Sequence, residues 1–449
     1  MDISLFVVYN KLLNYYLKRR ITPLKNPFTK AGSKGVLLQN TMMLYLLTFS
    51  NYFLGLIVAP YETRVLGTEG YGILGAATAV MVYFQLFIDF GFLLSGTQDV
   101  ALNREDTGKL SAIFTAITVS KLLLTAVSAV ALVVLCSVLP VWQDRLSFYV
   151  LCFCYTALNS MIPDYLYRGL ERMSAITVRT VCIKAFFTLG IVLLVKSPAD
   201  LWKIPMINIV GNGIAAAYSF HDVNRRFGIR FVRVTGREVM ATMKASSVFF
   251  YSRIATTAYS AMNTIILDVI SGTGAPTAFY TSADKLITTG KSALSPISDS
   301  LYPYMVKNKD FKLVKKVLLI LEPLIFVFCA VFFVFAEPLC AFIFGPDFAP
   351  AGQVLRAMLP VGVVILPSYI FGFPMMSAMG IAKHANYSVI FGSVLHIINL
   401  TVLWATGNIN MVTLGISVSV AETLILLYRI AVIVKNRHLL KKEGNHGAA

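Results

Sequence analysis

The chain of 449 residues has little charge and few cysteines, and it lacks the motifs of soluble enzymes. Charged residues make up 14% of the sequence, against about 25% in an average soluble protein. The six cysteines match no metal-binding spacing, and the five histidines are scattered. Only Thr289-Gly290-Lys291-Ser292 suggests a phosphate-binding loop, and there Lys285 stands where the motif requires a glycine. These absences predict that the protein is not an enzyme and holds no metal or cofactor.

Apolar residues are abundant instead and make up 57% of the chain. They recur in runs of about 20 residues, the length a helix needs to cross the hydrocarbon core of a bilayer. The pattern predicts an all-α integral membrane protein with about twelve transmembrane helices, in two pseudo-equivalent six-helix lobes around a central cavity. We expect the helices at residues 36–60, 71–95, 110–139, 147–167, 174–195, 203–221, 245–270, 277–302, 313–336, 351–378, 384–406 and 411–434.

The basic residues outside these helices alternate strongly between the two sides of the membrane. If the N-terminus is cytoplasmic, the cytoplasmic segments carry 27 basic residues and the outer loops only 4, as the positive-inside rule requires. Both termini are therefore predicted to be cytoplasmic. The excess of 39 basic over 22 acidic residues then reflects topology and contact with anionic lipid headgroups, and not nucleic-acid binding.

The expected organisation has five parts, and a short internal repeat supports its division into halves. Gly67-Thr68-Glu69-Gly70 follows the first predicted helix, and Gly272-Thr273-Gly274 follows the seventh, about 205 residues later. Two such halves are typical of secondary transporters that bind substrate between them. The parts are a basic amphipathic cytoplasmic segment (1–35), an N-terminal six-helix lobe (36–221), a basic cytoplasmic linker (222–244), a C-terminal six-helix lobe (245–434) and a cytoplasmic tail (435–449).

Polar and ionisable residues inside the predicted helices are the candidate functional residues, because charge within a bilayer is costly and faces a cavity or a partner. Arg356 and Arg429 lie near helix ends, where snorkelling to the membrane surface explains them. The eighth helix carries a polar stripe of Asp284, Thr288, Lys291 and Ser295, and the seventh a stripe of Arg253, Thr257, Ser260 and Thr264. The first two helices add Asn40, Asn51, Gln85 and Asp89.

These stripes fit either hydrogen bonding within a static bundle or a water-filled cavity between the lobes. Because they lie on corresponding helices of the two halves, the cavity is favoured. Several cations in one cavity predict an anionic ligand such as a diphosphate, for which lysine and arginine are the usual partners. The candidate anion-binding residues are Arg253, Lys285, Lys291, Lys184, Lys121 and Arg179.

Moving a diphosphate lipid across a membrane moves net charge, so we expect coupling to H⁺, to Na⁺ or to the membrane potential. The candidate coupling acids are Asp284, Glu422 and Asp268. A structural alternative stays open for two of them. Glu422 could simply be paired with a basic neighbour, and Asp268 lies close enough to the outer end of its helix to be solvated there.

Short segments distributed along the chain carry a family resemblance. They are V-L-G-T-E-G-Y-G (65–72), F-I-D-F-G-F (87–92), S-G-T (95–97), Y-R-G-L-E-R-M (167–173), Y-T-S-A-D-K-L (280–286), S-P-I (295–297), L-Y-P (301–303) and F-G-P-D-F (344–348). In this order and spacing the chain resembles, over about residues 36–435, the Wzx-type polysaccharide flippases. Their superfamily also contains multidrug and toxic-compound extruders and lipid II flippases.

The resemblance implies a flippase of the bacterial inner membrane that works by alternating access. Its implied substrate is an undecaprenyl-diphosphate-linked oligosaccharide, moved from the cytoplasmic to the outer leaflet for O-antigen or capsule assembly, with a polysaccharide polymerase and chain-length machinery as possible partners. Asp284 and Lys285 match the family's Ala-Asp-Lys element. Arg168, Gly169 and Glu171 match its cytoplasmic loop after the fourth helix, although Tyr167-Arg168 departs from the usual aromatic residue and glutamine, so we expect that loop to be structural.

Two other functions are compatible with a twelve-helix membrane protein. A cation-coupled multidrug extruder of the same fold would favour an acidic cavity, whereas here the deep basic residues at least match the acidic ones in number. A membrane-embedded polysaccharide polymerase or ligase would need a large periplasmic loop to hold donor and acceptor. The longest predicted outer loop (337–350) has about 14 residues, which disfavours that function.

The charge distribution leads to a testable topology. Position 236 lies in the basic linker, so a cysteine introduced there (Gly236→Cys) should not react with a membrane-impermeant thiol reagent added to intact cells. Permeabilised cells serve as the positive control, because the same cysteine should then be labelled. Ready labelling in intact cells would contradict the twelve-helix arrangement.

Overall fold

The computed structural model describes residues 33–440, without the side chains of 33–41, 44–49, 51–53, 252, 255–260 and 440. Within that range the regular structure consists of helices, and no strand occurs. Eight helical segments of the described chain are long and apolar enough to cross a bilayer by length and composition. Three long helices that fall outside this group carry more polar residues: α9 (Lys203–Phe227), α10 (Gly236–Ser271) and α11 (Gly274–Asn308).

The N-terminal lobe contains the first six predicted helices. The first two are found in one long element, α2, whose two helical segments join at Gly67. There φ is 68° and ψ is −175°, a left-handed conformation that favours glycine. The elements are α2 (Ser33–Asp89), α3 (Phe92–Leu102), α4 (Thr107–Val138), α5 (Pro140–Gln143), α6 (Leu146–Met161), α7 (Asp164–Gly169), α8 (Met173–Leu194), η1 (Pro198–Asp200) and α9 (Lys203–Phe227).

The other six predicted helices are found in the C-terminal half. They correspond to α10, α11, α12, α14, α16 and α17, so each of the twelve expected helices is present. The elements are α10 (Gly236–Ser271), α11 (Gly274–Asn308), α12 (Phe311–Val334), α13 (Ala336–Phe344), η2 (Pro346–Phe348), α14 (Ala351–Phe371), α15 (Phe373–Ala378), α16 (Lys383–Ala405), α17 (Met411–Lys435) and η3 (Arg437–Leu440).

The helices on either side of the basic linker extend into it. Helix α9 continues to Phe227, and Gly228 ends it with a φ of 67°. Helix α10 already begins at Gly236, because Thr235 and Glu238 form a capping box in which each side chain bonds the other residue's backbone N–H. Only residues 228–235 between the two helices lack regular structure.

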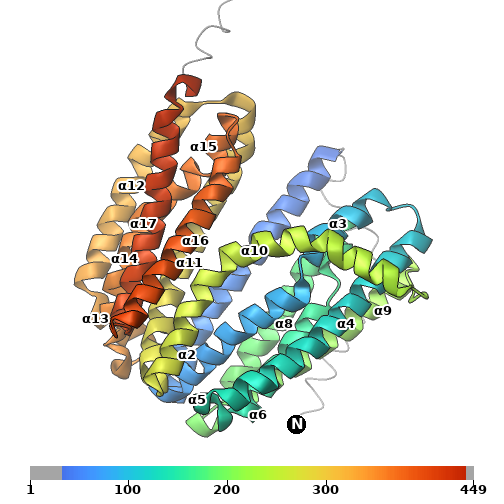
Figure 1. The fold of residues 1–449 in the computed structure, drawn as a ribbon, viewed down its shortest axis with the longest axis horizontal. Coiled ribbons are helices and arrows are strands. Elements are labelled where there is room, and N and C mark those ends of the chain that lie inside the picture. The colour runs from blue at the N-terminus through green and yellow to red at the C-terminus, as the bar shows by residue number, and fades with distance from the viewer. Residues whose placement is uncertain (1–32, 441–449) are drawn as a thin grey trace, which may run out of the picture.

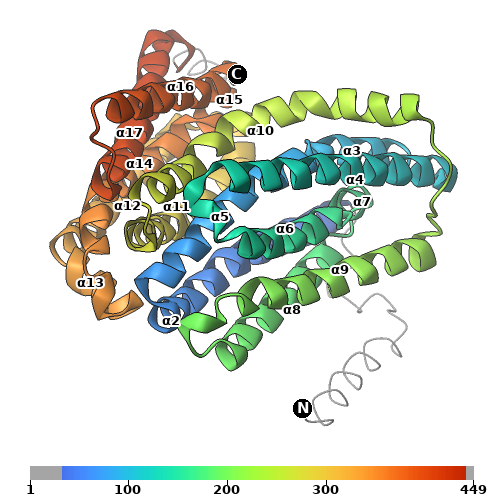
Figure 2. The same ribbon diagram turned by 60° about the horizontal axis from the view of Figure 1, so that its bottom comes forward.

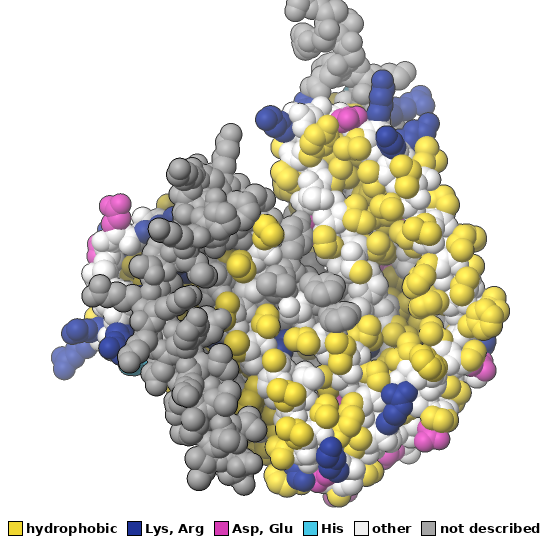
Figure 3. All heavy atoms as spheres, turned by 180° about the vertical axis from the view of Figure 1, so that it is seen from behind, with side chains coloured by type: hydrophobic (Ala, Val, Ile, Leu, Met, Phe, Trp, Pro, Cys, Tyr) yellow, Lys and Arg dark blue, Asp and Glu magenta, His cyan; other side chains and the backbone are white. Residues whose placement is uncertain are grey.

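Apolar side chains cover the outer face of the helices. Leu319, Leu324 and Phe326 of α12 are each more than half exposed, which suits a helix that faces lipid. Figure 3 shows the same distribution on the C-terminal lobe, where apolar side chains cover the middle and charged side chains gather towards the two ends.

The two lobes converge at one end of the molecule and diverge towards the other (Figure 1). The convergent end holds the Gly67 junction of α2, α5, the α10–α11 turn and α13, and on the predicted topology it is the outer end. Helix α10 lies along α3 and α4 of the N-terminal lobe (Figure 2) and also packs on α11 and α16 of the C-terminal lobe. The helices of the two lobes therefore lie closest together at the convergent end (Figure 1).

The two glycine-containing repeats meet at the convergent end. The backbone N–H of Gly274 donates a hydrogen bond to Glu69 Oε2 at 2.9 Å, across 205 residues of sequence. The backbones approach so closely that a Cβ atom on Gly72 would lie 1.8 Å from the carbonyl oxygen of Gly274. Only glycine fits at Gly72, which lies two residues beyond the first repeat's segment, and only glycine fits at Gly274, where a Cβ atom would lie 2.3 Å from the carbonyl oxygen of Glu69.

Polar side chains surround this glycine contact. Trp142 Nε1 donates to Asp268 Oδ2 at 2.8 Å, and Arg145 lies 3.4 Å from Asp268 and 3.6 Å from Glu69. Asp268 belongs to α10, whereas Trp142 lies in α5 of the N-terminal lobe and Arg145 lies between α5 and α6. We call Glu69, Gly72, Trp142, Arg145, Asp268 and Gly274 the outer contact.

A methyl group at Gly72 should open the outer contact, because its Cβ cannot coexist with the Gly274 carbonyl. The measurement is thiol labelling of Thr277→Cys, at a position buried one turn below Gly274, in a background without the native cysteines. We expect protection from an external reagent in the parent and labelling when Gly72→Ala is added. Gly290→Ala, whose Cβ would meet no atom within 4 Å, is the control. Unchanged protection with Gly72→Ala at a normal protein level would show that the outer contact does not close this end.

Candidate functional site

Lys285 extends from α11 towards α2, at the place where the two lobes meet. Its side chain interacts with the hydroxyl of Tyr71 and electrostatically with the carboxylate of Glu62. Its Cε atom would lie 3.8 Å from a Cβ placed on Gly55, so it lies against the first segment of α2. Glu62 and Tyr71 are only 8% and 3% exposed. One cation of the C-terminal lobe is therefore held among polar groups of the N-terminal lobe.

A second cation, Lys184 of α8, is close enough to Lys285 for electrostatic repulsion between them. Both were among the predicted anion-binding residues, and the structure brings them together from opposite lobes. We call Glu62, Tyr71, Lys184 and Lys285 the interlobe cluster. With two ammonium groups and one carboxylate, its formal charge is positive, which is the sign required to bind an anion.

Lys291, another predicted anion-binding residue, lies between two carboxylates of the C-terminal lobe. Its Nζ atom is 2.6 Å from Glu422 Oε1, and Asp284 interacts with it electrostatically and with Thr288 through a hydrogen bond. Two of the predicted coupling acids thus share one lysine. We call Asp284, Lys291 and Glu422 the acidic triad, whose formal charge is negative.

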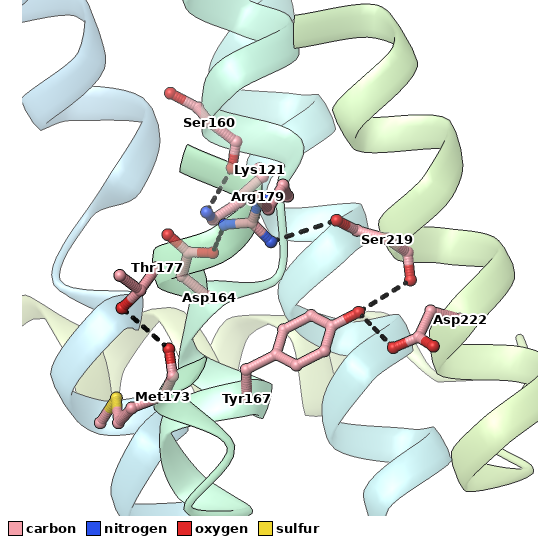
Figure 4. Close-up of polar contacts among 9 residues, drawn as sticks. All are labelled: Lys121, Ser160, Asp164, Tyr167, Met173, Thr177, Arg179, Ser219 and Asp222. Carbon is pink, nitrogen blue, oxygen red and sulfur yellow. Dashed lines mark hydrogen bonds and ion pairs between the residues drawn. The ribbon is translucent and has the colours of Figure 1, made fainter. Parts of the chain in front are cut away.

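The other two predicted anion-binding cations of the N-terminal lobe are paired within that lobe (Figure 4). Lys121 Nζ lies 3.0 Å from Asp89 Oδ1 and also donates to the Ser160 carbonyl. Arg179 pairs with Asp164 and donates to Ser219 Oγ at 3.2 Å. These pairs give Lys121, Arg179 and the predicted cavity residue Asp89 structural partners.

The loop after the fourth predicted helix also forms contacts within the N-terminal lobe. Tyr167 donates to Asp222 Oδ2 at 2.9 Å, as Figure 4 shows. Arg104 lies 2.8 Å from Glu171. Both contacts agree with the structural role expected for the Y-R-G-L-E-R-M segment.

Two sequence-based interpretations are wrong. Asp268 is fully buried in the outer contact and is not solvated, because α5 places Trp142 and Arg145 over it. Arg429 does not snorkel: it is 7% exposed and donates to Ser388 Oγ and Ser368 Oγ, each at 2.9 Å. Snorkelling was expected because Arg429 lies near a helix end. The packing of α14 and α16 on either side of the arginine buries it instead. Arg356 is half-buried beside Glu337, at 2.6 Å.

The remaining predicted residues are placed as follows. Arg253 lies half-buried on α10, the helix that contacts both lobes. Gln85 on α2 and Thr288 and Ser295 on α11 are half-buried, and Thr264 on α10 is buried. The side chains of Asn40, Asn51, Thr257 and Ser260 lie outside the described residues.

Sequence reasoning missed Glu62 and Tyr71. Glu62 falls just beyond the first predicted helix, in a segment taken as an outer loop, so it was not considered a charge within the membrane. Tyr71 was quoted within the V-L-G-T-E-G-Y-G segment but was given no role. The first segment of α2 continues past Pro60 as far as Gly67 and carries Glu62 into the lobe interface, and Tyr71 lies at the start of the second segment.

The chain is similar in sequence and in fold to known proteins. Residues 37–309 match the family model described as polysaccharide biosynthesis protein. The chain belongs to this family. Two curated relatives, from Shigella dysenteriae and Escherichia coli (strain K12), are both described as putative O-antigen transporters. Each is 25% identical, over 88% and 80% of this chain and 99% and 88% of the relative, respectively. Both curated relatives are named transporters. This agrees with the prediction that the protein is not an enzyme.

Solved structures confirm the predicted fold class. A lipid II flippase, MurJ, in an inward closed conformation has a TM-score of 0.65 and 13% identity, covering 90% of this chain and 89% of that one. An inward-facing multidrug transporter of the MATE family also has a TM-score of 0.65, with 12% identity over 88% of this chain and 96% of that one. The chain therefore has the fold of these two transporters. The family match and the two O-antigen transporter relatives confirm the resemblance found in its short motifs.

Proposed function

We propose that the protein is a flippase that moves an undecaprenyl-diphosphate-linked oligosaccharide from the cytoplasmic to the outer leaflet of the bacterial inner membrane. It would act by alternating access in O-antigen or capsular polysaccharide biosynthesis. The observation that carries the proposal is the positive interlobe cluster, in a chain whose family acts in polysaccharide biosynthesis. The names of the two curated relatives support the same class of substrate.

The interlobe cluster offers the chemistry that a diphosphate needs. Lys285 and Lys184 are compact cations on flexible stems, suited to bind phosphate oxygens as point charges. Because the two lysines belong to opposite lobes, a movement of one lobe against the other changes their distances to a ligand that bridges them. Transporters built from two repeats place their site at such an interface. A charge-assisted hydrogen bond is worth about 1.5–3 kcal/mol, so two contacts would make the headgroup the main anchor of the substrate.

The arrangement of the lobes fits loading from the cytoplasm. The outer contact closes the convergent end just beyond the cluster, whereas the lobes separate towards the opposite end (Figure 1). The headgroup would reach the cluster between the lobes, with polar residues such as Gln85 and Arg253 near the sugars. The polyprenyl tail would remain in the lipid. After flipping, a polysaccharide polymerase and its chain-length machinery would take the product.

The acidic triad is the proposed site of coupling to H⁺ or Na⁺. Two carboxylates around Lys291 leave one negative charge, which a proton or a sodium ion would neutralise. Asp268 is engaged in the outer contact, so Asp284 and Glu422 are the better placed of the three acids. The membrane potential would act in addition on the net charge that moves. A multidrug extruder of this fold handles cations, and the positive interlobe cluster makes that function the weaker proposal.

Replacing Lys285 or Lys184 by alanine should reduce flipping by about an order of magnitude or more, because each change removes a charge-assisted contact to the headgroup. The measurement is complementation of surface-polysaccharide synthesis in a flippase-null strain, with the protein level measured alongside. Lys285→Arg, which retains the charge, should retain more function than Lys285→Ala. Lys109→Ala, at an exposed lysine, is the control and should remain active. If both alanine variants complement as well as Lys109→Ala, the diphosphate is not held at this cluster.

Transport into vesicles should respond to an imposed pH or sodium gradient and lose that response in Asp284→Asn or Glu422→Gln. The reason is that each change replaces one of the two carboxylates around Lys291 by a neutral amide. Glu337→Gln, which removes a carboxylate on α13 outside the triad, should leave the response intact. If transport by the parent protein does not respond to pH, sodium or the membrane potential, then neither Asp284 nor Glu422 is a coupling acid.

A further inference from the structure

We propose that the basic segment between α9 and α10 is a defined binding site for the headgroup of an anionic phospholipid. Residues 228–235, which connect these two helices without regular structure, are called the linker strap. Arginines of the strap and of the adjoining helix ends contact the lipid phosphate, and Phe231 lies against the acyl chains. The site is separate from the interlobe cluster, and the inference does not depend on the proposed function.

Hydrogen bonds hold the linker strap along α4 of the N-terminal lobe. The backbone N–H of Arg230 donates to Ser111 Oγ at 3.2 Å, and that of Val232 donates to Thr115 Oγ1 at 3.1 Å. Ser111 and Thr115 are four residues apart and therefore lie on the same face of α4. Ile229 of the strap is 1% exposed and packs in the apolar core of this lobe. The strap thus has a fixed path along the margin of the lobe (Figure 2).

The length of α4 places the strap at the level of lipid headgroups. The helix has 32 residues and is therefore about 48 Å long, whereas the hydrocarbon core of a bilayer is about 30 Å thick. Its ends must extend into the headgroup layers. Ser111 and Thr115 lie in the first turns after its start at Thr107, and on the predicted topology this is the cytoplasmic end. The strap therefore lies at the leaflet whose anionic lipids attract basic segments.

Five exposed arginines give this region an excess of positive charge. They are Arg225 and Arg226 at the end of α9, Arg230 and Arg233 in the strap, and Arg237 in the first turn of α10. None of the five is in an ion pair with a residue that the structure describes. A guanidinium group binds phosphate oxygens through two parallel hydrogen bonds. The arginines therefore have the chemistry and the exposure to bind a lipid phosphate.

The acids around the strap are engaged within the protein. Asp106 caps the start of α4, Asp222 accepts a hydrogen bond from Tyr167, and Glu238 belongs to the capping box of α10. Within residues 222–238, the five arginines outnumber the two acids and leave a formal charge of +3. An anion from outside the chain is needed to balance this charge.

An exposed aromatic side chain favours a phospholipid over a soluble anion. The ring of Phe231 lies 5.0 Å from that of Phe114 and 6.1 Å from that of Phe220, so the lobe supports it from one side. Phe231 is nevertheless 60% exposed, and the neighbouring Val232 is 40% exposed. Exposed apolar side chains between arginines are typical of segments that lie in the membrane interface. A phospholipid offers both groups that this surface needs, a phosphate for the arginines and acyl chains for Phe231.

The experiment uses Phe231→Trp as a fluorescent reporter in the strap of the full-length protein. The native tryptophans, Trp142, Trp202 and Trp404, lie at the outer end on the predicted topology, and the parent protein gives their background signal. The purified protein is placed in phosphatidylcholine vesicles with increasing fractions of brominated phosphatidylglycerol or brominated phosphatidylcholine. Bromine quenches tryptophan fluorescence at short range. We expect phosphatidylglycerol to quench the introduced tryptophan at a clearly lower fraction than phosphatidylcholine does.

Removing strap arginines should weaken this preference. Arg230→Gln combined with Arg233→Gln in the reporter protein should lower it by about fivefold for each arginine, which corresponds to about 1 kcal/mol per basic residue near the surface. Lys315→Gln combined with Lys316→Gln is the matched control, because it removes the same charge from exposed lysines of α12. The control should keep the preference of the reporter protein.

A second variant tests the fixed position of the strap. Ser111→Ala combined with Thr115→Ala removes the two hydroxyls that hold it and should also reduce the preference, although every arginine is still present. If the arginine variant does not fold, this variant decides.

Three results would overturn the proposal. The first is equal quenching by the two brominated lipids. The second is an equal loss of preference in the lysine control, because the charge of the whole surface would then attract the lipid. The third is displacement of brominated phosphatidylglycerol by an equimolar amount of undecaprenyl diphosphate, which would assign the strap to the substrate headgroup instead.

Discussion

A charge inside a bilayer has to be compensated, and this constraint determines how most of the deep polar residues of the protein are arranged. Lys121 is held by Asp89, Arg179 by Asp164 and Lys291 by Glu422. Each of these pairs joins helices of the same lobe. Such pairs stabilise a lobe as a unit, since breaking a buried pair by removing one partner costs about 3–5 kcal/mol. The lobes can therefore move as bodies without exposing their internal charges to lipid.

The interlobe cluster differs because its compensation crosses the boundary between the lobes. Lys285 comes from α11, whereas Glu62 and Tyr71 come from α2 and Lys184 from α8. A rocking motion of the lobes changes these interactions and leaves the internal pairs intact. The outer contact, with its glycine-to-glycine approach at Gly72 and Gly274, lies next to the cluster and holds the convergent end closed. The proposed ligand site and the outer contact are thus adjacent in space, which is required if one is to influence the other.

Much of the fold could be predicted from the sequence, because the bilayer imposes a fixed helix length and the basic residues mark one side. All twelve predicted helices are found, and the repeats that suggested two halves are in contact through Glu69 and Gly274. The candidate site was less predictable, because its pairings join residues far apart in the chain. Lys291 and Glu422 are 131 residues apart, and helix periodicity carries no information on which helices become neighbours. Glu62 was missed because the first helix was predicted to end at residue 60. An acid that lies within the helix was therefore assigned to a loop.

The central claim is that the protein recognises its substrate through the diphosphate, and one comparison tests it most directly. Two fluorescent lipids with the same oligosaccharide and the same prenyl tail would be placed in vesicles containing the purified protein, one linked through a diphosphate and the other through a neutral ether. The appearance of each lipid in the opposite leaflet would be followed with time. Rapid flipping of the diphosphate lipid alone is the predicted result. Equal rates for the two lipids would contradict the account.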